Sequence, residues 1–144
     1  MEYVVAILFD GPRDHVVLIE KDHPEWQRGR LNGMGGKIEA GETAAEACSR
    51  ECLEEGGVTI PAKAWREFAA MQFTEDNGTT GVVHFLTAAC EANLKSLTTE
   101  EVSWYSVWGV LDGDLLVIPN LRWLVPMAMD PGRPICTFYE AGRG

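Results

Sequence analysis

Short runs of apolar and β-branched residues, each bounded by turn residues, predict most of the secondary structure. Gly11-Pro12-Arg13-Asp14 ends the first run, and Asp76-Asn77-Gly78-Thr79 lies between two later runs as a strong hairpin signal. Residues 22–36 contain a proline and four glycines, so we expect a loop there with at most one short strand. The expected strands are residues 3–9, 15–20, 65–75, 80–90 and 103–109.

A helix is predicted from about residue 44 to residue 55. This stretch has neither glycine nor proline, and alanine and glutamate dominate it. Thr43 and Glu46 have the spacing of a capping box at its start, and Gly56-Gly57 supplies its end. A second, C-terminal helix is expected at residues 120–129, before an Asp-Pro-Gly sequence. Mixed strands with one central and one C-terminal helix predict an α/β or α+β fold.

Length and composition fit one globular domain, which we expect to span residues 1–144. The chain is 46% hydrophobic, which is enough to bury a core without disulfides, and its four cysteines lack the CxxC spacing of a zinc site. It has 22 acidic and 12 basic residues, for a net charge of −10. This balance disfavours nucleic acid polymers and anionic membranes, but not a small phosphorylated ligand that binds through a divalent cation.

The sequence also indicates a compartment. The first apolar run has an acidic flank and is too short for a signal peptide, and no stretch approaches transmembrane length. The cysteines fit small apolar side chains in a reducing cytosol. We therefore expect a cytoplasmic protein, as a monomer or a homodimer.

Glutamates gather on one face of the predicted helix. Glu51, Glu54 and Glu55 are spaced by three and four residues, which places their Cβ atoms roughly 5–6 Å apart. One interpretation is a solvated acidic face, with Arg50 pairing with Glu46 or Glu54. The other is a site for a hard divalent cation such as Mg²⁺ or Mn²⁺. Small residues on the same face favour the second interpretation, because metal and substrate would need a close approach. These residues are Ala44, Ala47 and Cys48.

The segment from Gly36 to Val58 resembles the signature of the Nudix hydrolase family, GX5EX7REUXEEXGU, in which U is a bulky apolar residue. With each residue type near about 7% of usage, a chance match somewhere in the chain is on the order of one in a million. One U position holds Cys52, which is smaller than the usual residue and affects packing more than chemistry. The matching fixed positions are Gly36, Glu42, Arg50, Glu51, Glu54, Glu55 and Gly57.

The resemblance implies a fold and a metal. The fold is an α/β/α sandwich with a mixed sheet, and the activity is Mg²⁺-dependent hydrolysis of a nucleoside diphosphate linked to another group, with Mn²⁺ as a possible substitute. The Gly35 carbonyl would join Glu51, Glu54 and Glu55 as a metal ligand. A further acid is expected from the segment before residue 103, with Glu101 as the candidate and a solvated loop as the alternative.

The resemblance also implies roles around the metal. Arg50 and Glu42 would form an ion pair that orients the glutamates, and Lys37 would lie near phosphate. A glutamate of the cluster would help to deprotonate the attacking water. The residues expected to act in catalysis are thus Glu42, Arg50, Glu51 and Glu54.

Two asparagines and three apolar side chains are candidates for recognising a nucleotide base. The stretch Leu31-Asn32-Gly33-Met34-Gly35-Gly36-Lys37 resembles the branch of the family that hydrolyses oxidised purine nucleoside triphosphates, in which the asparagine contacts the base. Asn32 is therefore a candidate, although Asn-Gly is equally a turn dipeptide. Asn120 is a second candidate, with the N-cap of the last helix as its alternative. Apolar platforms for a base, each of which could instead be core, are Trp26, Phe73 and Ile118.

These observations predict a MutT-like Nudix hydrolase. Its substrate would be a nucleoside triphosphate, such as the oxidised purine 8-oxo-dGTP, and its products a nucleoside monophosphate and pyrophosphate. A pyrophosphatase acting on ADP-ribose or another nucleotide sugar is the alternative within the family. A catalytically silent binding module is the alternative outside catalysis, but such a module need not keep the glutamates. His84, inside an apolar strand, is expected to be structural.

Overall fold

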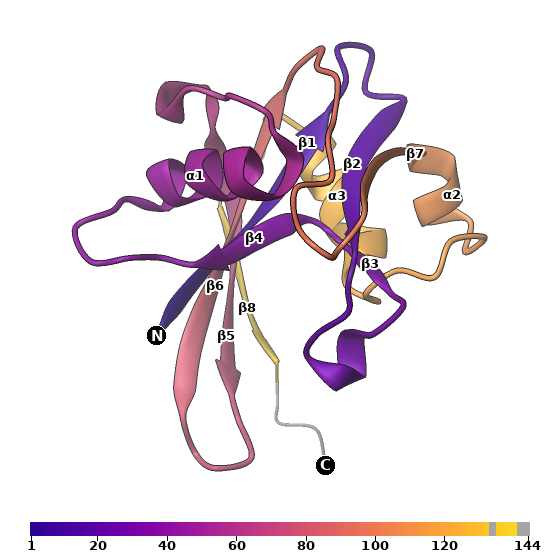
Figure 1. The fold of residues 1–144 in the computed structure, drawn as a ribbon. Coiled ribbons are helices and arrows are strands. Elements are labelled where there is room, and N and C mark those ends of the chain that lie inside the picture. Colours follow the sequence, from indigo (N-terminus) through magenta and orange to yellow (C-terminus); the bar gives the residue numbers. More distant parts are fainter. Residues whose placement is uncertain (133–134, 141–144) are drawn as a thin grey trace.

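The computed structural model describes residues 1–132 and 135–140. Within them, an eight-stranded mixed sheet forms the centre of the molecule, and helices lie on both of its faces (Figure 1). The helices are α1 (Ala44–Gly56), α2 (Val107–Leu111) and α3 (Leu121–Met129), with short 3-10 turns η1 (Glu25–Gln27) and η2 (Ala62–Ala64). The strands are β1 (Glu2–Phe9), β2 (His15–Glu20), β3 (Leu31–Asn32), β4 (Met34–Lys37), β5 (Arg66–Thr74), β6 (Thr80–Ala89), β7 (Val102–Ser106) and β8 (Cys136–Glu140).

The strand order is β3-β2-β1-β6-β5-β8, with β4 also paired to β1 and β7 to β2. The β1–β6 and β5–β8 pairs are parallel, and the other pairs are antiparallel. Helix α1 covers one face of the sheet, and α3 packs on the opposite face (Figure 1). The predicted α/β/α sandwich with a mixed sheet is confirmed.

Strand β1 lies in the middle of the sheet and supplies both cores. Val4, Ala6 and Leu8 pack under α1, whereas Ile7 and Phe9 pack toward α3. Since both faces are buried, the strand reads in the sequence as one continuous apolar run rather than an alternating one.

The central helix has the predicted ends. Thr43 Oγ1 accepts a hydrogen bond from the Glu46 amide at 3.1 Å, and the Thr43 amide donates to the Glu46 carboxylate at 2.9 Å. Gly57 follows the helix in the left-handed conformation with φ 67°, which favours glycine. Among the described residues, no helix is long and apolar enough to span a membrane.

Three segments differ from the prediction. Residues 22–36, expected as a loop with at most one short strand, contain β3 and most of β4. Strand β4 pairs with β1 because glycine lets the two backbones approach: a Cβ on Gly35 would lie 2.0 Å from the Val4 carbonyl oxygen. The strand expected at residues 103–109 ends at Ser106 and continues as α2. Strand β8 was not predicted; Phe138 anchors it, with ring centroids 4.6 Å from Trp123 and 6.0 Å from Phe85.

His84 on β6 lies between two carboxylates from neighbouring strands. Its Nδ1 contacts Glu67 of β5, and its Nε2 lies 2.9 Å from Glu2 Oε1 of β1. Burial alone would lower the pKa of the imidazole, but the two carboxylates outweigh burial and raise it. The imidazole therefore joins three strands, which fits the structural role expected for it.

We predict that this contact makes stability depend on pH. A histidine whose pKa is raised in the folded state stabilises the fold fully below its unfolded pKa of about 6.5, and that contribution disappears as pH rises through the folded pKa. His84→Gln should therefore flatten the decline in unfolding free energy between about pH 6 and pH 9, measured by urea denaturation. An unchanged slope in the variant would contradict the assignment.

Candidate active site

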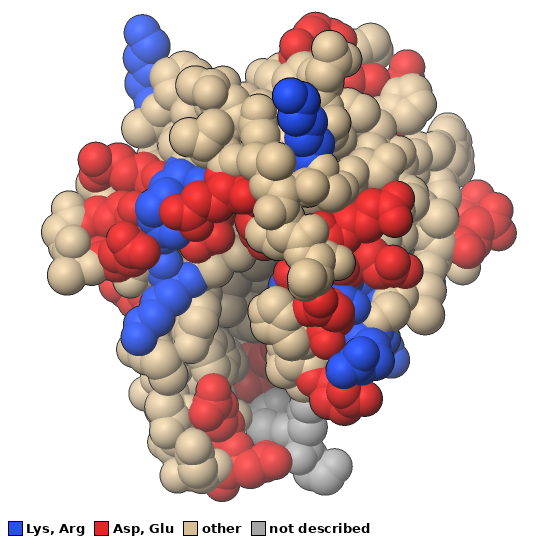
Figure 2. All heavy atoms as spheres, viewed as in Figure 1, with Lys and Arg blue, Asp and Glu red and all other residues tan. Residues whose placement is uncertain are grey.

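A cavity of about 280 Å³ lies where α1 and three other segments of the chain meet. Helix α1 supplies its acidic wall, β4 supplies backbone, and the segments around residues 21–23 and 98–100 close it. Figure 2 shows acidic side chains gathered around basic ones over α1, on the same face of the molecule. The lining residues are Lys21, His23, Gly35, Glu51, Glu54, Glu55, Thr98, Thr99 and Glu100.

The glycines of β4 let the glutamates of α1 lie directly on the strand. The Gly35 amide donates to Glu55 Oε1 at 2.9 Å, and Glu55 is only 8% exposed. A Cβ on Gly36 would lie 2.3 Å from the Glu51 carboxylate. A side chain at residue 36 would therefore displace the Glu51 carboxylate from the position in which Arg50 holds it, independently of any ligand.

Arg50 organises the acidic side chains beside the cavity. Its guanidinium binds Glu42 through two hydrogen bonds of 2.7 and 2.9 Å, so the ion pair implied by the family resemblance is present. It also donates to Glu51 at 2.8 Å, to Glu54 at 3.3 Å and to the Lys37 carbonyl at 3.0 Å. Of the two pairings considered for a solvated face, the one with Glu54 forms.

Burial changes the ionisation of two of these glutamates. Desolvation raises the pKa of Glu55 to about 7, even though the Gly35 amide favours the charged form. Burial likewise raises the pKa of Glu51 against the effect of Arg50, whereas the hydrogen bonds from Arg50 lower the pKa of Glu42. A pocket that desolvates carboxylates in this way fits a hard divalent cation, which would supply the missing positive charge.

The small residues on α1 serve a different purpose from the one expected. Ala47 and Cys48 are fully buried between the helix and the sheet, together with Cys52. They let α1 pack closely on the sheet and do not line the cavity. The prediction that small residues make room for metal and substrate is therefore wrong for these positions.

Of the two adjacent acids before β7, Glu100 and not the candidate Glu101 lines the cavity. Glu100 is 4% exposed, whereas Glu101 is exposed to solvent and is absent from the cavity lining. Glu100 lies in the bend of residues 98–100 that closes the cavity, and Glu101 follows the bend just before β7.

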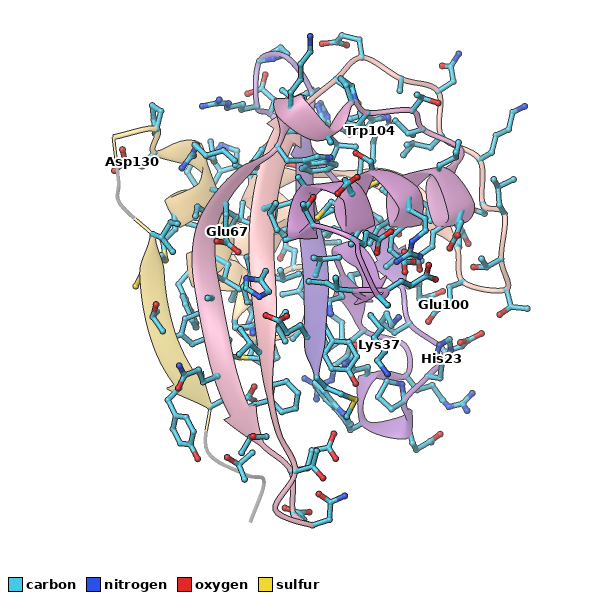
Figure 3. All side chains as sticks on the ribbon, turned by 90° about the vertical axis from the view of Figure 1, so that its left-hand side faces the viewer. His23, Lys37, Glu67, Glu100, Trp104 and Asp130 are labelled. Atoms are coloured by element: carbon cyan, nitrogen blue, oxygen red, sulfur yellow. The ribbon has the colours of Figure 1, made fainter. Side chains whose placement is uncertain are left out.

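Asp22 and His23 form a cluster with Glu100 that sequence reasoning missed. Each offers a metal-ligating atom, and these atoms lie within 4.8 Å of one another. Figure 3 shows His23 and Glu100 side by side below α1, with Lys37 on the same side of the molecule. No spacing in the sequence indicates this cluster, because the pairing of β2 with β7 brings its members together.

The predicted phosphate and base contacts lie outside this cavity. Lys37 is exposed at the end of β4, and Trp26 is 41% exposed on η1. Asn32 ends β3, its Oδ1 accepts from the Gly33 amide at 2.8 Å, and its Nδ2 donates to Gln27 at 3.4 Å, so its side-chain amide already makes local hydrogen bonds.

The other base candidates are dispersed. Phe73 lies with its ring centroid 6.1 Å from that of Tyr3, in a second hollow of about 460 Å³ that shares no lining residue with the first among those described. Ile118 is 5% exposed in the core beside α3, which excludes it as an open platform. Asn120 occupies the N-cap position of α3, as its alternative interpretation expects, but its side chain makes no capping hydrogen bond.

Comparisons with known proteins agree with the fold and the signature. A family model described as the NUDIX domain matches residues 2–122. The structure is similar to that of a MutT protein from Bacillus halodurans, with a TM-score of 0.75 and 24% identity over 97% of this chain and 90% of that one. It is also similar to the NUDIX domain of NrtR from Shewanella oneidensis, solved with ADP ribose, with a TM-score of 0.72 and 19% identity over 90% of this chain and 86% of that one.

A curated relative is similar over a shorter stretch. An oxidized purine nucleoside triphosphate hydrolase from Danio rerio is 53% identical over 32 residues, which are 22% of this chain and 20% of that protein's length. The structural likenesses show the fold, and the domain match spans most of the chain and contains the whole signature from Gly36 to Val58. The chain therefore belongs to the Nudix family.

Proposed function

We propose that this enzyme hydrolyses a nucleoside triphosphate to a nucleoside monophosphate and pyrophosphate, with Mg²⁺ as its metal ion. The observation that carries the proposal is the complete carboxylate set on α1, oriented by Arg50 and set against the backbone of Gly35. The stretch of identity to an oxidized purine nucleoside triphosphate hydrolase supports an oxidised purine such as 8-oxo-dGTP as the substrate.

The residues that line the cavity would bind the metal ion. Glu51, Glu54, Glu55 and the Gly35 carbonyl would hold the divalent cation, with Glu100 as a further oxygen donor in the same cavity. When bound, the cation supplies charge neutralisation on the phosphate oxygens and makes the attacking water more acidic.

The remaining steps belong to the protein. Glu51 or Glu54 accepts a proton from the attacking water as the water oxygen bonds to the α-phosphorus. The bond between the α-phosphorus and the bridging oxygen then breaks, and pyrophosphate leaves. Arg50, fixed by Glu42, keeps both glutamates oriented, and Lys37 at the end of β4 attracts the phosphates.

Metal binding should stabilise the fold. An ion that binds only the folded state at 100 times its Kd adds roughly 2.7 kcal/mol, so millimolar Mg²⁺ or Mn²⁺ should raise the Tm of the metal-free protein by several degrees. Thermal melts against NaCl of matched ionic strength measure this shift. No shift with either ion would count against a metal site.

A substrate panel tests the proposal. We expect kcat/KM in Mg²⁺ to be higher for 8-oxo-dGTP than for dGTP, and higher for both than for ADP-ribose. The structural likeness to an NrtR domain solved with ADP ribose makes ADP-ribose the second candidate. A preference for ADP-ribose or another nucleotide sugar would overturn the triphosphate proposal and leave the family membership unaffected.

Asn120 should discriminate between purine bases. An amide both donates and accepts hydrogen bonds, so it suits a base edge whose pattern changes on oxidation, and the Asn120 side chain is not used as a helix cap. Asn120→Ala should lower kcat/KM for 8-oxo-dGTP roughly ten- to a hundredfold more than for dGTP. Asn32→Ala should show a smaller difference, because its side chain also accepts a hydrogen bond from the Gly33 amide between β3 and β4. Equal losses for both substrates in both variants would assign these residues to local structure.

A further inference from the structure

Lys21 is the one lysine or arginine among the described residues that line the acidic cavity. Its side chain is 15% exposed, and its Nζ lies 3.2 Å from Glu100 Oε1. Glu100 is still more buried, with 4% of its side chain exposed. An ammonium ion and a carboxylate thus meet inside the pocket that would hold the divalent cation.

Both partners of this ion pair are fixed in place. The Lys21 amide donates to the Arg30 carbonyl at 2.9 Å, and the Lys21 carbonyl accepts from the Gly29 amide at 2.8 Å. The second oxygen of Glu100 accepts from the Asp22 amide at 2.8 Å. Each carboxylate oxygen of Glu100 therefore has a donor from the same dipeptide, so the carboxylate is satisfied without a metal ion.

The acidic side chains that line the cavity outnumber the basic ones. Four glutamates line the cavity, and the charge of Lys21 also acts on Glu55. His23, the other basic group, has 75% of its side chain exposed, so solvent screens its charge strongly. Arg50 offsets Glu51 and Glu54 from beside the cavity, so Lys21 is the cation that offsets the other two glutamates, Glu100 and Glu55, from within it.

We propose that Lys21 is a built-in counter-ion of the metal site. In the metal-free enzyme it neutralises Glu100 and holds its carboxylate in the cavity, and in the loaded enzyme it weakens the binding of the divalent cation by charge repulsion. This inference rests on the proposed function, since it concerns the same metal site.

Titration calorimetry with Mn²⁺ alone tests the proposal. Lys21→Met removes the ammonium and keeps an apolar stem, so it should lower the Kd for Mn²⁺ by roughly threefold to tenfold, as expected for one charge acting on a dication across a few ångströms of partly screened space. Lys21→Arg keeps the charge and should bind Mn²⁺ as the wild type does. Lys63→Met is the matched control, because it removes an exposed lysine on η2, outside the cavity, and should leave the Kd unchanged.

The metal-free proteins give a second readout. Lys21→Met should have a lower Tm without metal, because Glu100 is left buried with a single donor, and adding Glu100→Gln should restore part of that loss. If the single variant Lys21→Met does not fold, the double variant with Glu100→Gln should fold. If the double variant does not fold either, Lys21 has a purely structural role and the proposal is overturned.

The outcomes separate this proposal from the proposed function. An unchanged or higher Kd in Lys21→Met, with normal binding by the wild type, would overturn the counter-ion role alone. No Mn²⁺ binding by the wild type would contradict the metal-dependent function, and the counter-ion role with it.

Discussion

Glu54→Gln is expected to reduce kcat for pyrophosphate release by roughly 10³-fold while leaving the fold intact. The substitution removes a ligand charge and keeps the shape of the side chain. Glu54 is 56% exposed and meets Arg50 at 3.3 Å, so its charge contributes little to stability. Steady-state kinetics in Mg²⁺ and a thermal melt of the same preparation measure the two effects separately.

Glu46→Gln provides the matched control on the same helix. Glutamine can replace glutamate in a capping box, and Glu46 lies outside the cavity, so kcat and Tm should both stay near the wild-type values. Activity near the wild-type level in Glu54→Gln would remove Glu54 from the mechanism. Lost activity accompanied by unfolding would instead assign it a structural role.

Arg50→Met should have the largest effect on stability. Its guanidinium holds the carboxylates of Glu42 and Glu51, each with 13% of its side chain exposed, and their mutual repulsion would be uncompensated without it. Breaking an ion pair of this burial should cost about 2–4 kcal/mol of unfolding free energy, and kcat should fall as well because Glu51 is no longer oriented. Urea denaturation of the metal-free protein measures the first effect.

Arg50→Lys separates charge from geometry. A lysine restores the positive charge but cannot make the paired hydrogen bonds to Glu42, so we expect partial recovery of stability and little recovery of kcat. An unfolding free energy within about 0.5 kcal/mol of the wild type in Arg50→Met would contradict the organising role.

The elements that local sequence patterns determine were predictable from the sequence. The hairpin of β5 and β6 follows from its Asp-Asn-Gly-Thr turn, and α1 from its capping box and the glycines at its end. Strand β8 was not predictable in this way, because parallel pairing with β5 and the aromatic contacts of Phe138 hold it in place. Such contacts join residues far apart in the chain, and no local spacing encodes them.

The candidate site likewise contains residues that the sequence signature predicts and residues that only the folded sheet brings together. The signature gives the glutamates of α1 and the Arg50–Glu42 pair by number, because α1 and the loop just before it carry these residues. The choice between Glu100 and Glu101 depends on which face of the chain turns inward at the start of β7. The approach of Lys21 and His23 depends on sheet pairing, so neither was predictable from spacing.

The identity of the phosphorus products tests the central claim most directly. Wild-type enzyme with 8-oxo-dGTP or dGTP and Mg²⁺, followed by ³¹P NMR, should yield nucleoside monophosphate and pyrophosphate in equal amounts, and neither should form in EDTA. Nucleoside diphosphate and inorganic phosphate as the products, or equal turnover without a divalent cation, would contradict the account.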